Sequence, residues 1–381
     1  MLAAMAAAPF AASAADTAGV RAALAPYVKR LEIPGYVSVL VDGAREEWVC
    51  GGWSDTDAKK PMRPDSLFRV CSMTKGIVGA AAAKLAVEGI ISLDDPVSKY
   101  LPEFAKLERR EGATLIPVKN VLTLRDCLSH TGGFPFETKV SEALGWNGAP
   151  LRVAAAAGAA TPLLFEPGTS WRYSNAGLDV AGAAIEKATG EKIEQHLKRV
   201  IFDPLGMKDT TFRPSPSQMK RLVSIYYMET NRTCRLMPSY RHLAEPYGAP
   251  ERGASCGAGL FSTPQNMLEF YRMLAFNGVA RDGRRVLPEE AVKILATRQT
   301  PANVKTAYSL GMFVEGEWFG HDGAIKTAAL VNPKRHAVCL FMLQGDYPGR
   351  MNRWHQFNVW KPCADRFFNQ NTGKGTNGET P

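Results

Sequence analysis

The amino-acid sequence predicts an α/β (α+β) protein with one antiparallel sheet flanked by helices and an inserted, mainly helical domain. Strand-like segments lie near both ends of the chain, at 35–54 and at 308–345. Between them, apolar residues follow helical spacing, interrupted by proline and glycine. Strands at both ends with helices between are typical of one sheet built from the two ends of the chain, with the helical middle packed against it.

The first quarter of the chain predicts a helix, a hairpin and a second helix. Residues 16–31 place apolar side chains at helical spacing, and the run at 35–43 is typical of a strand that ends in a turn. The stretch at 45–54 is its expected hairpin partner. An Ala-rich segment at 73–88, which stops at a glycine, predicts a buried helix.

The rest of the chain alternates helical pieces with turns and then changes to strands. The clearest helical pieces lie at 123–133 and 178–202, and another capped helix is expected within 257–278. Four successive antiparallel strands are expected within 308–345, with turns at glycine and at Asn-Pro. A final helix follows, in which Pro362 should produce a kink.

These elements predict a division of the chain into two domains. We expect the sheet-containing domain to comprise 16–89 and 251–368, with the helical domain at 90–250 between them. Residues 1–15 are interpreted as the remnant of a signal peptide. The polar, Gly-rich segment 369–381 is expected to be a disordered tail.

The beginning of the chain predicts export. It has a short Ala-rich apolar stretch followed by small residues suited to cleavage near Ala14 or Ala15, although no Lys or Arg precedes Arg21. The alternative is a frayed Ala-rich terminus. We expect a periplasmic or secreted protein without an integral membrane segment, because no later apolar run approaches the roughly 18 residues that a spanning helix needs.

Composition argues against several other classes of protein. The net charge is +9, but the basic residues are scattered and mixed with acidic ones, so we expect no nucleic-acid partner. The seven cysteines include no C-x-x-C pair, which removes the usual spacing signal of a metal site. We therefore expect no metal and no cofactor. Because seven is odd, at least one cysteine stays free, and the sequence does not indicate which others pair.

The stretch FRVCSMTKGIVGA places Ser72 and Lys75 three residues apart, where a strand-like run becomes a helix. One face of a helical turn can hold both side chains, so a lysine with a lowered pKa could remove the serine proton. The alternative is that Ser72 only caps the helix. A second S-x-x-K, from Ser217 to Lys220, lies in a polar loop interrupted by proline and is interpreted as an accident. The pattern alone does not decide between nucleophile and cap.

Two further motifs favour a catalytic serine. The chain has a single Y-x-N, formed by Tyr173 and Asn175. A phenol near a Ser–Lys pair can pass a proton to a leaving group, and an amide can hydrogen-bond both the lysine and a substrate. Near the C-terminus, His321 and Gly323 lie on an expected strand, where the imidazole could orient a substrate. The backbone amide of Ala324 could then complete an oxyanion hole.

In this order, S-x-x-K, Y-x-N and H-x-G resemble the motifs of the penicillin-recognising serine hydrolases. With Y-x-N as its second motif, the sequence resembles one branch of these enzymes. That branch contains class C β-lactamases, D-alanyl-D-alanine carboxypeptidases, D-aminopeptidases and family VIII esterases. Flanking stretches such as LTLRDCLSHTGG, FEPGTSWRYSNAG and GAGLFSTPQNM agree, and the resemblance runs from about 18 to 367. It implies a β-lactamase/transpeptidase-like fold with the site between sheet and helical domain.

The resemblance also implies a role for each residue of these motifs. Ser72 would be the acyl-accepting nucleophile and Lys75 its base. Tyr173 would be the general acid and base, and Asn175 an orienting donor. His321 would stand at the third motif, and the amides of Ser72 and Ala324 would form the oxyanion hole. The sequence His130-Thr-Gly132 imitates the third motif but precedes Y-x-N, so we expect it to be structural.

His321 decides which substrates we expect. A lysine there would bind a substrate carboxylate, whereas an imidazole is mostly neutral at pH 7, and Asp322 beside it disfavours an anion further. We therefore expect an acyl-enzyme reaction on a small-molecule ester or a D-amino-acid amide or peptide. Hydrolysis of a β-lactam is the alternative within this class. A non-catalytic envelope or binding protein is the alternative outside it, although it would have no chemical reason to keep Ser72, Lys75 and Tyr173 together.

Overall fold

The computed structural model describes residues 16, 18–240, 242–243, 245–347 and 355–370. The predicted signal-peptide remnant, and all but two residues of the predicted tail, lie outside these residues. Among the described helices, none is both long enough and apolar enough to cross a membrane.

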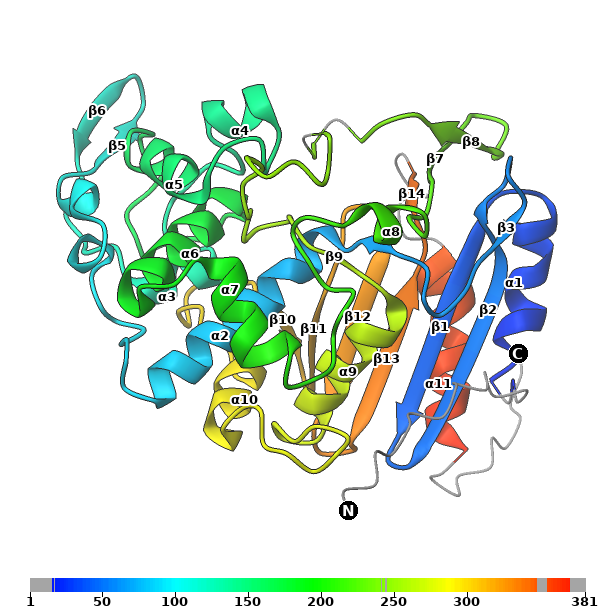
Figure 1. Ribbon diagram of the computed structural model, residues 1–381. Helices are drawn as coiled ribbons and strands as arrows, with labels where there is room; N and C mark the ends of the chain where they lie inside the picture. The colour runs from blue at the N-terminus through cyan, green and yellow to red at the C-terminus, as the bar shows by residue number, and fades with distance from the viewer. Residues whose placement is uncertain (1–15, 17, 241, 244, 348–354, 371–381) are drawn as a thin grey trace, which may run out of the picture.

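A seven-stranded antiparallel sheet forms the right-hand half of the molecule in Figure 1. Its order is β10-β11-β12-β13-β1-β2-β3, so strands from the two ends of the chain meet where β1 pairs with β13. The prediction of one sheet built from both ends is confirmed. The strands are β1 (Gly35–Asp42), β2 (Arg45–Asp55), β3 (Lys60–Pro61), β10 (Phe313–Glu315), β11 (Trp318–Asp322), β12 (Thr327–Asn332) and β13 (Ala337–Met342).

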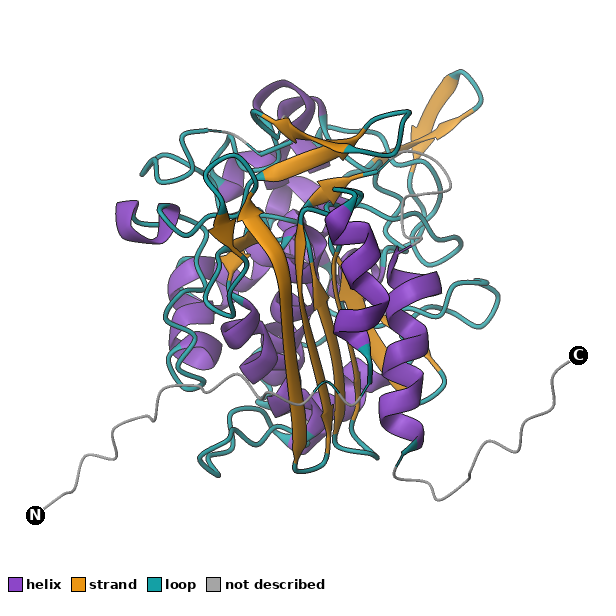
Figure 2. Cartoon of the chain, turned by 90° about the vertical axis from the view of Figure 1, so that its right-hand side faces the viewer, coloured by secondary structure: helices purple, strands orange, loops and turns teal. Residues whose placement is uncertain are grey.

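Helices cover both faces of this sheet, as Figure 2 shows. Helices α1 and α11 pack on one face, and α2, α9 and α10 lie on the other. The α-helices are α1 (Val20–Lys29), α2 (Thr74–Val87), α3 (Leu124–Ser129), α4 (Lys139–Leu144), α5 (Leu151–Ala159), α6 (Asn175–Thr189), α7 (Ile193–Leu197), α8 (Pro216–Met219), α9 (Pro264–Ala275), α10 (Glu289–Ala296) and α11 (Lys361–Asn369).

The apolar run of β1 is explained by burial on both faces. Successive side chains of a strand point to opposite sides. Val37 and Val39 join the large apolar cluster that includes α2 and α9, while Tyr36 and Leu40 join the cluster under α1 and α11. Because neither face meets water, the strand is continuously hydrophobic rather than alternating.

The middle of the chain differs from the predicted run of helices. The stretch expected as one helix at 178–202 divides into α6, α7 and a π-helical turn, because Gly190 adopts a left-handed φ of 73° that ends α6. Residues 90–250 also contain two hairpins that were not predicted. The hairpin at 108–117 is mostly exposed, whereas the first strand of the hairpin at 225–237 is mostly buried. These and the remaining short strands are β4 (Phe68–Arg69), β5 (Glu108–Glu111), β6 (Thr114–Pro117), β7 (Ile225–Met228), β8 (Cys234–Met237), β9 (Phe261–Ser262) and β14 (Gly345–Asp346).

The helical part and the sheet share one continuous cluster of buried apolar residues, which includes Leu178 of α6 and Val338 of β13. The predicted domain boundaries at 90 and 250 stay a prediction.

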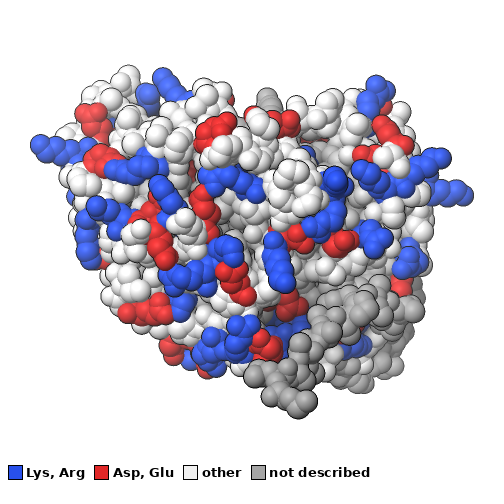
Figure 3. All heavy atoms as spheres, viewed as in Figure 1, with Lys and Arg blue, Asp and Glu red and all other residues white. Residues whose placement is uncertain are grey.

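On the face seen in Figure 3, basic and acidic side chains are interspersed. The remaining short helical turns are Cys71–Met73, Val97–Lys99, Pro102–Ala105, Lys198–Phe202 and His355–Trp360.

Helix α2 packs closely against the segment that precedes β10, and the closest approach is at Gly79. It is rich in alanine and buried over most of its length. A Cβ atom added at Gly79 would overlap the backbone carbonyl of Leu310. This close approach fixes the segment that precedes β10 against the helix that begins just after Ser72.

Replacing Gly79 by alanine should therefore destabilise the fold by about 3 kcal/mol, because a backbone carbonyl cannot turn away from the added methyl group. Urea unfolding measures the loss. Gly190→Ala is the matched control, since Gly190 has a positive φ but open space around its Cβ position, and it should lose only about 1 kcal/mol. A loss at Gly79 no larger than at Gly190 would contradict the close approach.

Candidate active site

Ser72 lies in a 3₁₀ turn, Cys71–Met73, that leads directly into α2. Its side chain is buried, and neither the turn nor α2 has a capping hydrogen bond from a side chain. The interpretation of Ser72 as a helix cap is therefore wrong. Cys71 precedes it with a φ of 46°, a left-handed conformation that is uncommon for a residue with a side chain. Such strain is concentrated at functional sites in proteins.

Lys75 extends from the first turn of α2 into a fully buried position beside Ser72. Its Nζ atom lies 3.2 Å from Ser72 Oγ, 2.6 Å from Asn175 Oδ1 and 2.6 Å from the backbone carbonyl oxygen of Gly257. A neutral amine has two hydrogens and one lone pair. The two short contacts go to oxygens that only accept, so the neutral amine keeps its lone pair for the hydroxyl of Ser72.

The environment of Lys75 favours this neutral form. Burial lowers the pKa of Lys75 to about 7, although the negative charge of Asp179 and, to a smaller extent, of Asp322 acts in the opposite direction. Removing an ammonium from water is costly unless it is fully compensated. A substantial fraction of Lys75 is therefore neutral near pH 7, as a base for Ser72 requires.

Asp179 holds the carbonyl group that Lys75 contacts. The carboxylate lies on α6, is buried, and accepts hydrogen bonds from the amide of Cys256 at 2.7 Å, the amide of Gly257 at 3.4 Å and the hydroxyl of Ser255 at 3.2 Å. Burial raises the pKa of Asp179 to about 7, while these hydrogen bonds lower it. Asp179 was not predicted as a site residue, and its signal in the sequence is a single carboxylate within the apolar run LDVAGAAI.

Tyr173 and Asn175 reach the site from the start of α6, where the side chain of Ser174 caps the helix. The ring centroid of Tyr173 lies 4.5 Å from Lys75 Nζ, and its hydroxyl is 3.4 Å from His321 Nε2. Asn175 accepts from Lys75 through Oδ1, while its buried Nδ2 has no hydrogen-bond partner among the described residues. That amide group is available to donate to a substrate.

His321 lies on β11 with both ring nitrogens in contact with the protein. Its Nδ1 atom is 2.6 Å from the backbone oxygen of Asp322, and its Nε2 atom is 3.0 Å from the hydroxyl of Tyr308. The carboxylate of Asp322 is 3.7 Å from Nδ1. The side chain of His321 is only 3% exposed, so it is not a free cation at the surface of the site.

Gly323 and Ala324 form the turn between β11 and β12 and lie against the residues before Ser72. Gly323 has no room for a side chain, because a Cβ atom would come within 2.6 Å of the Val70 carbonyl. The hydroxyl of Thr327 donates to the same carbonyl at 3.2 Å. Burial raises the pKa of the Cys71 thiol to about 12, and the Ala324 amide is among the groups that oppose this shift by donating to the sulfur. The Ala324 amide thus lies beside the turn that holds Ser72.

His130 and Tyr308 also belong to this cluster, although neither was predicted as a site residue. His130 ends α3 with a left-handed φ of 66°, and its ring lies 4.5 Å from that of Tyr173 between centroids. Its Nε2 atom is 3.1 Å from the hydroxyl of Tyr308. Phe136 stacks on Tyr173 at 6.0 Å from the other direction and is 37% exposed. Aromatic rings therefore surround the catalytic candidates.

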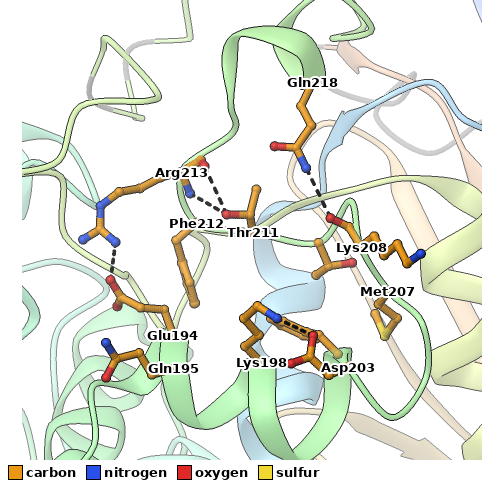
Figure 4. A pocket seen from close by; sticks show the side chains of 12 residues that line it. Glu194, Gln195, Lys198, Asp203, Met207, Lys208, Thr211, Phe212, Arg213 and Gln218 are labelled. Atoms are coloured by element: carbon orange, nitrogen blue, oxygen red, sulfur yellow. Dashed lines mark hydrogen bonds and ion pairs between the residues drawn. The ribbon is translucent and has the colours of Figure 1, made fainter.

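A hollow of about 380 Å³, shown in Figure 4, is lined by none of the predicted site residues. Charged side chains in it pair with one another, Arg213 with Glu194 and Lys198 with Asp203. The chemistry-bearing groups of the three motifs thus gather around Ser72 and not around this hollow.

The seven cysteines are all free thiols.

Comparison with known proteins identifies the family. A family model described as Beta-lactamase matches residues 20–358. The chain belongs to the beta-lactamase family. This family of serine hydrolases accounts for the fold, in which a large antiparallel sheet is flanked by helices, and for the predicted class of enzyme. The resemblance inferred from the three motifs is confirmed.

Relatives within the family carry different names. Protein Rv1367c of Mycobacterium tuberculosis is 30% identical over 330 residues, which cover 82% of this chain and 79% of that protein. Esterase EstB of Burkholderia gladioli is 30% identical over 247 residues, which cover 59% of this chain and 61% of the esterase. The fold is similar to that of simvastatin synthase LovD of Aspergillus terreus, with a TM-score of 0.77 at 21% identity, covering 95% of this chain and 100% of that chain.

The lowered pKa of Lys75 predicts how the reactivity of Ser72 depends on pH. Lys75 accepts the serine proton only when it is neutral, so the rate of labelling by a fluorophosphonate should rise about tenfold per pH unit below pH 7 and level off above it. Intact-mass measurement of the labelled fraction over time gives this rate between pH 5 and 9.

The chain supplies its own control for this measurement. Ser217 belongs to the second S-x-x-K, lies on the exposed one-turn helix α8, and hydrogen-bonds Ser215 at 2.9 Å. Ser72→Ala should abolish labelling, and Ser217→Ala should leave it unchanged. A rate that is flat from pH 5 to 9, or that falls as the pH rises, would show that Lys75 is not the base.

Proposed function

We propose that the protein is a serine acyl-hydrolase that cleaves neutral carboxylic esters through an acyl-enzyme formed on Ser72. The observation that carries this proposal is the fully buried Lys75, whose Nζ atom lies 3.2 Å from Ser72 Oγ with its other two hydrogen bonds directed to acceptors. A helix cap or a structural core has no need of a buried amine in contact with a buried serine. A base beside a nucleophile does.

The proposed reaction has two steps with the same groups. Lys75 removes the proton of Ser72 while Oγ attacks the ester carbonyl carbon, and the amides of Ser72 and Ala324 hold the developing oxyanion. Tyr173, whose ring lies against Lys75, transfers a proton to the departing alkoxide and regains one from the protonated Lys75, so an alcohol leaves and the acyl group stays on the serine. Water then attacks the acyl-enzyme with its proton taken by the same pair, which releases the acid and restores the serine.

Two considerations support a neutral ester as the substrate. The third motif carries His321 in place of a fixed cation, and its ring is buried with Nδ1 held by a carbonyl. A substrate carboxylate would lack a charge-assisted hydrogen bond worth roughly 1.5–3 kcal/mol. This disfavours the carboxylate-bearing β-lactams and peptide ends. The likeness to a bacterial esterase, EstB, is in agreement with ester hydrolysis.

Trapping the intermediate tests the proposal directly. Incubation with a neutral nitrophenyl ester and a rapid acid quench should give an intact mass increased by one acyl group, located on the peptide that contains Ser72. Ser72→Ala should show neither the adduct nor turnover. If the wild-type protein forms no adduct and turns over neither an activated ester nor a penicillin, the chain is a non-catalytic member of its family and the proposal is wrong.

Replacing Tyr173 by phenylalanine should lower kcat for the ester by about 10²–10⁴-fold, because the leaving alkoxide loses its proton donor. The ring that packs beside Lys75 is kept, so KM should change little. Steady-state kinetics measure both constants. Phe136→Leu is a suitable control, since it removes the ring stacked on Tyr173 without removing a proton donor. An equal fall in kcat for both variants would assign Tyr173 a packing role only.

A further inference from the structure

A chain of hydrogen bonds runs through the back of the site. In the hydrogen bond at each of its two ends, only one of the two atoms can be the donor. At one end, the backbone amide of Ser174 lies 3.2 Å from His130 Nδ1. An amide only donates, so Nδ1 of His130 must accept. At the other end, Nδ1 of His321 lies 2.6 Å from the backbone oxygen of Asp322. A carbonyl only accepts, so Nδ1 of His321 must carry a hydrogen.

The two ends determine the direction of every bond between them. Because Nδ1 of His130 accepts, the hydrogen of its neutral ring is on Nε2, which donates to the hydroxyl of Tyr308 at 3.1 Å. Tyr308 then has its own hydrogen left for the Nε2 atom of His321 at 3.0 Å. The three side chains are buried, with Tyr308 fully so. This is the hydrogen-bond chain from Ser174 through His130 and Tyr308 to His321.

Burial keeps the two inner members in the required forms. It lowers the pKa of His130 well below its ordinary value, with smaller contributions in the same direction from Lys75 and His321. It raises the pKa of the Tyr308 hydroxyl well above its ordinary value. His130 is therefore neutral and Tyr308 is a phenol at any pH at which the protein is assayed.

Protonation of His321 at Nε2 would disrupt this arrangement. Two N–H groups, from His130 and His321, would then point at the oxygen of Tyr308, whose own hydrogen would lose its acceptor. A buried donor without its partner costs about 1–3 kcal/mol. The hydrogen-bond chain thus opposes the imidazolium form of His321.

We propose that Tyr308 is a positioning residue that keeps His321 neutral, with the Nε2 lone pair accepting from the Tyr308 hydroxyl, and thereby makes the site select against substrate carboxylates. The hydroxyl of Tyr173 lies 3.4 Å from the same Nε2 atom, whose lone pair is already occupied, so its own hydrogen stays available for a leaving group. The third motif then accepts a hydrogen bond from Tyr308 instead of donating one to an anion. The effect on substrate specificity rests on the proposed ester hydrolysis. The protonation state of His321 does not depend on it.

The charges around His321 come from several elements. Asp322 on β11 has a carboxylate oxygen 3.7 Å from Nδ1, which favours the imidazolium form. Lys75 on α2 carries the charge that opposes it, and this charge lowers the pKa of the neighbouring His130. Tyr173 and Tyr308 face the ring from their loops, and His130, at the end of α3, contacts Tyr308 behind it. Removal of the Tyr308 hydroxyl should therefore release a ring that Asp322 favours in its charged form.

Nuclear magnetic resonance of protein labelled with ¹⁵N-histidine tests the state of His321. The His321 signals are assigned by their loss in His321→Asn. In the wild type they should show a hydrogen on Nδ1 and none on Nε2 at neutral pH. In Tyr308→Phe, the pH at which half of His321 is protonated should be higher than in the wild type by about one pH unit or more, closer to the ordinary value near 6.5.

Tyr271→Phe is the matched control. Tyr271 is another fully buried tyrosine, and its hydroxyl has no hydrogen-bond partner among the described residues. Its loss should leave the midpoint of His321 unchanged. A wild-type His321 with its hydrogen on Nε2, or equal midpoints in the wild type and Tyr308→Phe, would overturn the proposal. The wild-type spectrum decides this even if the Tyr308 variant does not fold.

Specificity gives the second readout. The ratio of kcat/KM for a carboxylate-bearing ester to that for its neutral methyl ester cancels the protonation of Lys75, which affects both substrates equally. The ratio should stay low and flat from pH 5.5 to 8 in the wild type. In Tyr308→Phe it should rise roughly tenfold at the acidic end, where the imidazolium can bind the anion. A flat ratio in both proteins would remove the specificity role. Absence of an acyl-enzyme in the wild type would instead reject the ester hydrolysis and leave the spectroscopic result standing.

Discussion

The buried amine of Lys75 is the constraint on which the arrangement of this site depends. An ammonium or amine removed from water needs a hydrogen-bond partner for each of its hydrogens. Those partners come from segments far apart in the sequence, Asn175 at the start of α6 and the carbonyl of Gly257 in the loop before α9. The loop is held in turn by Asp179, one turn further along α6. A single requirement for hydrogen-bond partners thus brings together α2, α6 and the loop at 255–257.

The glycines and aromatic residues around this centre complete its enclosure. Small residues on α2 let the segment before β10 approach the helix, and Tyr308 in that segment reaches both His130 and His321. The aromatic rings of Tyr173 and Phe136 cover the other side. Water is kept away from the amine and the imidazoles, so their protonation depends on fixed dipoles and hydrogen bonds rather than on solvent.

The sequence could predict the parts of this structure that depend on local chemistry. The continuous apolar run of β1 and the Ala-rich α2 identified a sheet and a buried helix, and the spacing of three motifs identified the family. The motif residues were predicted together, and the structure brings Ser72 and Asn175 within hydrogen-bond reach of Lys75, while their catalytic roles stay predictions. Residues such as Asp179 and Tyr308 were not predicted, because their significance lies in contacts across long sequence separations. The exposed hairpin at 108–117 was missed because its strands carry no alternating apolar pattern.

The pairing of Lys75 with Asp179 has a consequence for folding as well as for chemistry. Burial raises the pKa of Asp179 to about 7 and lowers the pKa of Lys75 to the same value. The folded state therefore binds more protons than the unfolded chain at Asp179 between about pH 4 and 7, so this group makes the protein less stable as the pH rises through that range. At Lys75 the unfolded chain binds more protons between pH 7 and about 10, so this group makes the protein more stable as the pH rises there. The contribution of these two groups to the free energy of unfolding is thus smallest near pH 7, which is also the pH at which Lys75 becomes neutral and can act as a base. The rest of the core must therefore supply the stability of the fold at that pH.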